Sequence, residues 1–158
     1  MGQASKRLLL KTRLAPIPRT GEKNGSKRHL LVDAHGVPLS LVVTGANRHD
    51  VTQLKPVLTA IVLRPPTGRR RFLYGDKGYD GEPARRDAKA KGYHPRISRK
   101  RRKAGRPPKK YRWVVEAAHS WFNRFRKLLV RYEKLAQNYE ALVHLAAAII
   151  CWRKAGVI

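Results

Sequence analysis

RFLYGDKGYD, residues 71–80, is the stretch that decides what kind of fold the chain can form. FLYGD (72–76) is a short apolar run with aromatic residues, and it predicts a buried strand that ends at Asp76. A turn at Gly78 follows, and the polar segment after it predicts a helix. In an open α/β sheet, functional groups gather at the carboxyl ends of strands, so Asp76 is a candidate site residue. The alternative is that Asp76 simply ends the strand.

The segments on either side of this stretch predict an α/β domain with few strands. HLLVDAHGVPLSLVVTG (29–45) has two apolar runs separated by Asp33 and Gly36, and it predicts an antiparallel hairpin beside the strand 72–76. The other expected elements are a helix over 51–62 capped by Asp50 or Thr52, a polar helix ending at Gly92, a strand at 94–98, and helices at 111–133 and 138–156, the last with Asn138 as its N-cap.

The first part of the chain gives no such signal. Residues 1–24 lack sustained periodicity, and Pro16, Pro18 and Gly21 interrupt them. They are expected to form an irregular basic leader, with the folded domain over 25–156.

The chain is strongly basic: 36 Lys and Arg against 10 Asp and Glu give a formal net charge of +26 over 158 residues. Such charge destabilises a compact state unless a polyanion compensates it, so nucleic acid is the expected partner. A membrane-surface or ribosome-associated protein is the alternative. The single cysteine, Cys151, excludes a disulfide framework and a zinc site built from cysteines, and it fits a reducing cytoplasm. The longest apolar stretch, 141–152, is about half of the ~20 residues that a membrane span needs.

Glu116 is the second candidate site residue because of its place in the helix expected at 111–133. One face of that helix carries the apolar stripe Val114, Ala118, Trp121, Phe125, Leu128 and Tyr132. Another face carries Arg112, Glu116, His119, Asn123 and Lys127, of which Glu116 is the only acid. Glu116 can pair with Arg112 on a solvated face. Two isolated acids on a very basic chain also suit Mg²⁺, which binds hard oxygen ligands beside a phosphate.

Three further features have two interpretations each. Trp113, Trp121 and Trp152 are expected in the core rather than stacked on bases. His49 either caps its loop or lies near the candidate carboxylates. RKRRKAGRPPKK (99–110) is either a nucleic-acid arm or a solvated loop, and the charge of the whole chain favours phosphate contact.

Four stretches in this order resemble bacterial insertion-sequence transposases of the DDE type: GSKRHLLVDAHGVPLSLVVTGANRHD, LYGDKGYD, RWVVEAAHSWFNRFRKLLVRYEK and ALVHLAAAIICW. The branch that looks most similar has a Tyr-Arg-Glu-Lys signature around its glutamate. The resemblance implies a ribonuclease-H-like α/β fold and metal-dependent DNA strand cleavage and transfer, with Mg²⁺ as cofactor and Mn²⁺ as its substitute. It also implies insertion-sequence ends and target DNA as partners, a homodimer or association with a full-length transposase, and a place on the nucleoid in a bacterial cytoplasm.

The resemblance assigns roles to individual residues. Asp76 matches the second catalytic aspartate and Glu116 the catalytic glutamate, so both are expected metal ligands. Arg112 matches the signature arginine and belongs to the expected catalytic set. The signature lysine falls at Asn123, with Arg124 next to it, and the signature tyrosine has no match in register. The expected DNA contacts are Lys77, Asn123, Arg124, Lys127, Arg99, Lys100, Arg101, Arg102 and Lys103.

One member of the family's triad has no match. The first catalytic aspartate of the family sits on the first strand of the sheet, and no aspartate precedes Asp33 in this chain. The sequence therefore predicts a domain without its first strand, either a truncated C-terminal part or the second reading frame of a frameshifted element. A non-catalytic DNA-binding remnant that interferes with a full-length transposase is the alternative. An RNA-binding or ribosomal protein is a third class, but it does not explain the placement of the acids.

Overall fold

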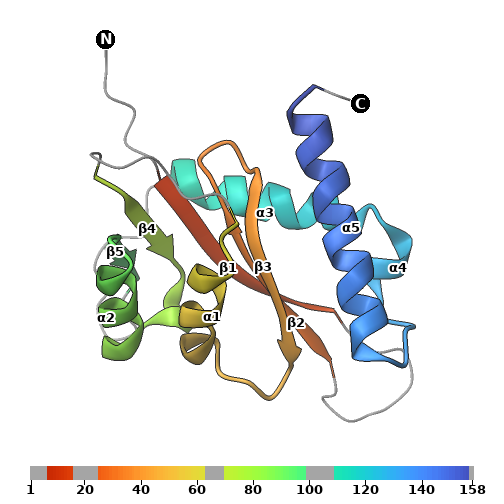
Figure 1. Cartoon of the computed structure of the whole chain (residues 1–158), viewed down its shortest axis with the longest axis horizontal. Coiled ribbons are helices and arrows are strands. Elements are labelled where there is room, and N and C mark those ends of the chain that lie inside the picture. The colour runs from red at the N-terminus through yellow and green to blue at the C-terminus, as the bar shows by residue number, and fades with distance from the viewer. Residues whose placement is uncertain (1–6, 16–24, 63–69, 99–108, 157–158) are drawn as a thin grey trace.

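The computed structural model describes residues 7–15, 25–62, 70–98 and 109–156, which form a five-stranded mixed sheet with helices on both faces (Figure 1). The strands are β1 (Arg7–Ala15), β2 (Ser26–Val32), β3 (Pro38–Gly45), β4 (Phe72–Gly75) and β5 (His94–Ile97), and their order across the sheet is β3-β2-β1-β4-β5. The helices are η1 (Asp50–Gln53), α1 (Leu54–Thr59), η2 (Lys77–Tyr79), α2 (Glu82–Ala90), α3 (Lys109–Asn123), α4 (Arg126–Leu129) and α5 (Ala136–Lys154), where η marks a 3-10 helix.

The central strand β1 overturns the prediction of an irregular leader for residues 7–15, and it also overturns the prediction of a sheet without its first strand. The rest of the predicted leader, 1–6 and 16–24, lies outside the described residues. β1 pairs antiparallel with β2 and parallel with β4, so the hairpin lies beside β1 and not beside β4 as predicted. Its leucines 8–10 are all buried because a central strand is covered on both faces. Such a run shows no alternation of apolar and polar residues, which is why the sequence pattern looked irregular.

The hairpin predicted over 29–45 is confirmed as β2 and β3, which pair antiparallel from Ser26 opposite Gly45 onward. Asp33 supplies the turn, because its Oδ1 accepts hydrogen bonds from the backbone N–H groups of His35 and Val37, both at 2.9 Å. The elements predicted between residues 72 and 98 are present as β4, α2 and β5.

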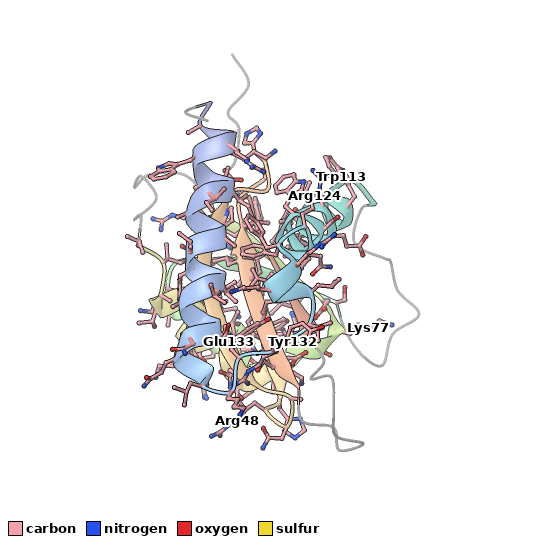
Figure 2. The ribbon with its side chains drawn as sticks, turned by 90° about the vertical axis from the view of Figure 1, so that its right-hand side faces the viewer. Arg48, Lys77, Trp113, Arg124, Tyr132 and Glu133 are labelled. Carbon is pink, nitrogen blue, oxygen red and sulfur yellow. The ribbon has the colours of Figure 1, made fainter. Side chains whose placement is uncertain are left out.

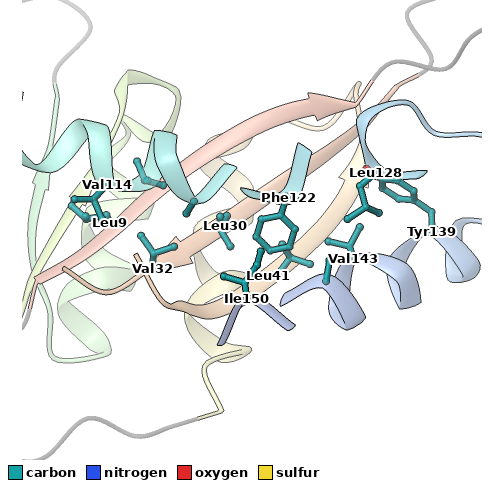
Figure 3. Packing of buried hydrophobic residues seen from close by; sticks show 13 residues of the cluster. Leu9, Leu30, Val32, Leu41, Val114, Phe122, Leu128, Tyr139, Val143 and Ile150 are labelled. Carbon is teal, nitrogen blue, oxygen red and sulfur yellow. The ribbon is translucent and has the colours of Figure 1, made fainter. Parts of the chain in front are cut away.

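Two hydrophobic clusters lie on opposite faces of the sheet, because successive side chains of a strand point to opposite sides. The α3–α5 cluster (Figure 3) consists of Leu9, Leu30, Val32, Leu41, Val114, Val115, Ala118, Phe122, Leu128, Tyr139, Val143, Ala146 and Ile150. The α1–α2 cluster consists of Leu8, Leu10, Leu31, Leu54, Val57, Leu58, Leu73, Tyr79, Ala84, Ala88, Tyr93 and Ile97. The sheet is therefore the middle layer of three.

The helix predicted over 111–133 is interrupted. α3 ends at Asn123, and Phe125 adopts an extended conformation (φ −82°, ψ 105°) before the short α4. Beyond α4, Arg131 ties the connection to β2, since its Nη1 donates to Ser26 Oγ at 2.6 Å. The apolar spacing continues across the break, so helical periodicity did not indicate it.

The last helix is confirmed as α5, but it begins at Ala136, so Asn138 is not its N-cap. Trp121 packs against the α3–α5 cluster, as predicted. Trp113 and Trp152 are 60% and 56% exposed, so the prediction that they lie in the core is wrong.

Candidate functional site

Asp76 follows β4 directly and so lies at the carboxyl end of the strand, as predicted. Its backbone is extended (φ −78°, ψ 178°), and it is the N-cap of η2. Its Oδ1 accepts a hydrogen bond from the Gly78 N–H at 3.0 Å. An aspartate in this position satisfies a backbone donor at the start of a helix. The turn in DKGYD therefore orients the carboxylate of Asp76.

Strand alternation assigns Asp76 to the face of the sheet that α3 covers. Leu73 belongs to the α1–α2 cluster, whereas Tyr74 packs against the α3–α5 cluster. Asp76 continues the alternation of Tyr74, because its backbone is still extended. Glu116 lies on α3 next to Val115, a buried member of the same cluster. The two candidate carboxylates thus come from elements that share one core, while a metal between them stays a prediction.

Three residues of the polar face of α3, Glu116, His119 and Asn123, are partly or fully buried, so this part of the face is not solvated as the alternative interpretation supposed. His119 is buried, and Glu116 and Asn123 are half-buried. Asn123 Oδ1 accepts a hydrogen bond at 2.9 Å from Nη2 of Arg28, a buried residue of β2. This contact fixes the rotation of α3 about its axis and hence the side on which Glu116 lies. Arg112 is one helical turn before Glu116 in the same helix.

The strand beside Asp76 carries no carboxylate. β1 and β4 are parallel with Leu10 opposite Gly75, so Lys11 follows Leu10 as Asp76 follows Gly75. The sequence of β1, RLLLKTRLA, contains no acid at all. The first strand is present and its aspartate is not, which corrects the prediction that the two are missing together.

The turn that carries Asp76 packs against Asp50, for which the sequence predicted only a capping role. Asp50 Oδ1 pairs with Lys27 Nζ at 3.1 Å. A Cβ atom built on Gly78 would lie only 2.7 Å from Asp50 Oδ2, so the carboxylate touches the glycine of the turn. The N-cap of η1 is the exposed His49, and no side chain caps that helix. No local pattern links ANRHD to DKGYD, so the sequence alone could not reveal this contact.

His29 is fully buried on the α1–α2 side of β2. Its Nδ1 lies 2.8 Å from the hydroxyl of Tyr79, and its Nε2 lies 2.9 Å from the hydroxyl of Thr44. Burial lowers the pKa of His29 to about 4, an effect that Asp50 opposes and Lys27 reinforces. His29 is therefore neutral near pH 7 and connects β2 and β3 to the DKGYD turn.

The predicted DNA contacts fall into three groups. Lys77, Arg124 and Lys127 are exposed, and in Figure 2 Lys77 and Arg124 lie to the right of α5. Asn123 is bonded to Arg28 on the inner side of α3, so a DNA contact through it stays a prediction. The contacts predicted at Arg99, Lys100, Arg101, Arg102 and Lys103 lie outside the described residues.

A cationic surface that the sequence did not indicate surrounds a cavity of about 460 Å³ at the β5 edge of the sheet. The cavity is lined by Arg70, Phe72, Glu82, Arg85, Lys89, His94, Pro95 and Arg96. The guanidinium of Arg96 lies 5.5 Å from the centre of the Phe72 ring, and the His94 ring is 5.7 Å from that of Phe72. Cations beside aromatic faces suit phosphates and bases.

The donor set for a metal is small. Within residues 7–15, 25–62, 70–98 and 109–156, no group of three or more His, Cys, Asp or Glu side chains is arranged to hold a metal ion. In those same ranges, no helix has the length and apolar character to cross a membrane. A metal held by Asp76 and Glu116 would have no third ligand of these types from the described part of the chain.

Residues 12–151 match the family model described as the transposase DDE domain. The chain belongs to the DDE transposase family. It is 42% identical over 142 residues to the transposase assigned to insertion sequence element IS402 of Burkholderia cepacia, and the match covers 87% of this chain and 67% of that protein.

Two solved structures show the fold of this DDE domain. The catalytic core domain of BIV integrase has a TM-score of 0.56 and 12% identity, and the match covers 90% of this chain and 80% of that one. A chain of the simian T-cell lymphotropic virus intasome, solved in complex with PP2A regulatory subunit B56 gamma, has a TM-score of 0.57 and 12% identity, with 92% and 46% covered. The predicted ribonuclease-H-like α/β class is confirmed, with the first strand present.

Proposed function

We propose that this DDE domain acts in DNA transposition by metal-dependent cleavage and transfer of DNA strands. The observation that carries the proposal is the position of Asp76, oriented by its turn at the end of β4 on the face of the sheet that α3 covers. Glu116 belongs to that helix, and Arg28 fixes the helix through Asn123. The hydrogen bond from Gly78 to Asp76 and the one from Arg28 to Asn123 thus support the two elements that carry the carboxylates.

Asp76 and Glu116 supply the donors that Mg²⁺ prefers, since this ion commonly binds through one or two carboxylates together with substrate phosphates. The bound ion would activate the attacking hydroxyl and stabilise the leaving oxygen, and Mn²⁺ would substitute for it. The protein's own part is to hold Asp76 by the Gly78 N–H and Glu116 by the packing of α3 on the sheet. Arg112, one turn before Glu116, is proposed to contact the same phosphate.

The exposed cations are proposed to hold the element ends and the target DNA. Lys77 stands next to Asp76, while Arg124 and Lys127 follow the end of α3. The cationic cavity at β5 offers a second stretch of surface for the same DNA. Binding should weaken steeply as salt rises, because each neutralised phosphate releases counterions.

A second candidate function is DNA binding without catalysis, in which the chain interferes with a full-length transposase. The absence of any acid in β1 favours it, because the family's first catalytic aspartate lies on the first strand and the residue that follows Leu10, as Asp76 follows Gly75, is Lys11.

The substitution Lys11→Asp separates the two candidates. It places a carboxylate on β1 at the position in line with Asp76. If the rest of the active site is intact, the variant should cleave a DNA that carries the element's ends, in Mg²⁺ or Mn²⁺. The added substitution Asp76→Asn should abolish the gain. Lys91→Asp is the matched control, because it changes the charge equally at an exposed position after α2.

Each outcome is decisive. Cleavage by Lys11→Asp but not by Lys91→Asp supports the proposal that the domain is catalytic. No activity in any variant, with DNA binding retained, supports the non-catalytic candidate. Robust cleavage by the unaltered chain would mean that another acid, Asp33 or Asp50, completes the triad.

A further inference from the structure

The outer edge of β5 carries the cavity of about 460 Å³ described above, here called the β5 cavity. β5 ends the strand order of the described sheet, and Figure 1 shows β5 and α2 together on the side of the molecule away from α5. Helix α2 lines the cavity with Glu82, Arg85 and Lys89, whose spacings of three and four residues place them on one face. Arg85 also ties α2 to the strand, because its Nη2 donates to Ile97 O at 3.0 Å. The β5 cavity is therefore a built part of the fold, with a volume typical of ligand sites.

The opposite wall of the β5 cavity is made of flat side chains. Phe72 of β4 lies opposite His94 of β5 in the strand register, and their ring centres are 5.7 Å apart. The guanidinium of Arg96, two residues further along β5, lies 5.5 Å from the centre of the Phe72 ring. His94 and Arg96 are exposed and Phe72 is half-buried, so all three planes are at least partly accessible. Aromatic rings and guanidinium planes of this kind are the surfaces on which nucleic-acid bases stack.

The charge of the lining selects a polyanion, and its shape selects an unpaired strand. The described lining residues include four cations, Arg70, Arg85, Lys89 and Arg96, against one acid, Glu82. Such an excess of positive charge attracts phosphates, but it does not distinguish a duplex from a single strand. The flat wall does distinguish them. Both faces of a base in duplex DNA are covered by the neighbouring base pairs, so only an unpaired base can stack on a protein side chain.

We propose that the β5 cavity binds single-stranded DNA, with a base stacked on the flat wall and a phosphate on Lys89. The proposal rests on DNA as the partner, as proposed above, but not on cleavage. Phe72 and Asp76 are four residues apart and lie on the same face of the sheet, because β4 and the backbone of Asp76 are extended. The separation is ~13 Å at ~3.3 Å per residue. An unpaired strand that begins beside Asp76 therefore reaches the β5 cavity after about four nucleotides, at the 3.4 Å rise of a stacked strand.

Fluorescence anisotropy with a labelled oligothymidylate, measured in EDTA over a series of salt concentrations, tests the proposal without any cleavage. Phe72→Leu keeps an apolar side chain in β4 and removes the ring, so it should weaken binding by about tenfold at every salt concentration. It should leave binding of a duplex of the same length unchanged. Lys89→Gln, on the exposed surface of α2, should make the slope of log affinity against log salt concentration shallower by about 0.7, the value for one phosphate of a single strand.

The matched controls lie outside the β5 cavity. Tyr132→Leu removes an aromatic ring that is 70% exposed, and Lys91→Gln removes an exposed cation just after α2; both should bind the oligothymidylate like the unaltered chain. Unchanged binding by Phe72→Leu, with its fold verified by thermal unfolding, overturns the proposal, as does an equal loss for the duplex. Competition by thymidine monophosphate at the same concentration as the oligothymidylate would mean a site for a free nucleotide, which also overturns it. Binding of duplex but not of single strands contradicts this proposal alone, whereas binding of neither contradicts the proposed function as well.

Discussion

Two neighbouring residues of β2, Arg28 and His29, bury polar side chains on opposite faces of the sheet, and they do so in different ways. Arg28 keeps its charge and donates to Asn123 of α3 at 2.9 Å. His29 is neutral and is hydrogen-bonded to Tyr79 of the DKGYD turn at 2.8 Å. The contact of Arg28 supports α3, which carries Glu116. The contact of His29 supports the DKGYD turn, which carries Asp76. β2 therefore supports both elements of the candidate site, through a hydrogen bond from a charged group on one face and a neutral hydrogen-bond network on the other.

The difference makes the two faces sensitive to different changes. The neutral network of His29 is sensitive to acidification, because protonating a buried imidazole carries a large cost in desolvation. The hydrogen bond of Arg28 is sensitive to loss of its acceptor, because a buried guanidinium cannot give up its charge. Each of the first two predictions below disturbs one face and leaves the other intact.

Acidification should disturb the His29 face and give the largest effect. The pKa of His29 is about 4 in the folded chain and 6.5 for an ordinary histidine. Below pH 6.5 the unfolded state binds a proton that the folded state does not, so the free energy of unfolding falls until about pH 4. The loss from this residue is about 3 kcal/mol. Urea unfolding across this pH range measures it, and His29→Gln, which does not titrate, should remove most of the dependence. A dependence that survives in His29→Gln would assign the effect elsewhere.

Loss of the acceptor should disturb the Arg28 face. Asn123→Ala removes the hydrogen bond to a buried guanidinium, which should cost about 2 kcal/mol and should not vary with pH between 5 and 7. Asn138→Ala is the matched control, because Asn138 is exposed and caps nothing. Thermal unfolding of the two variants measures the difference. Similar stability of both would mean that Asn123 does not anchor α3.

Overpacking of the DKGYD turn should have a smaller effect, between about 1 and 2 kcal/mol. In Gly78→Ala the new Cβ would lie 2.7 Å from Asp50 Oδ2 and 3.2 Å from Asp76 Oδ1. If the first contact causes the strain, Asp50→Ala should relieve part of it, so the double variant should be more stable than the two single losses predict. Strict additivity of the two losses, measured by urea unfolding, would contradict the contact.

The sequence predicted those elements whose signal is local. The hairpin has its own turn residues, Asp33 and Gly36, and β4 ends in a turn that Asp76 caps. β1 escaped prediction because a strand covered on both faces is a short apolar run without alternation, and Leu8–Leu10 is only that. The break between α3 and α4 escaped because the apolar spacing continues across it, and Phe125 and Leu128 on either side of the restart pack with the same cluster.

The candidate site was predicted only in part, for a similar reason. Asp76 and Glu116 stand out as acids in a basic chain, so composition alone draws attention to them. Their supports do not stand out, because Arg28 with Asn123 and His29 with Tyr79 are pairs that meet only in the folded sheet. Pairs so distant in sequence leave no periodic or motif signal in a single chain.

The smallest expected effect on stability also tests whether the charge of Asp50 acts on the buried ring of His29. Asp50→Asn keeps the shape of the side chain and removes its charge, and the ion pair with Lys27 is partly exposed, with side chains 21% and 23% accessible. The loss of stability near pH 7 should therefore stay below about 1 kcal/mol.

The pKa of His29 should respond to Asp50→Asn nonetheless. Asp50 raises that pKa, whereas burial and Lys27 lower it, so removing the carboxylate should move it below about 4. NMR titration of the His29 ring measures the shift directly. Asp80→Asn is the matched control, because Asp80 pairs with Arg85 at 2.7 Å and is not among the groups that shift His29. A His29 pKa that is unchanged in Asp50→Asn, or that moves equally in both variants, would mean that Asp50 does not act on His29, and that the loop ANRHD supports the DKGYD turn by contact alone.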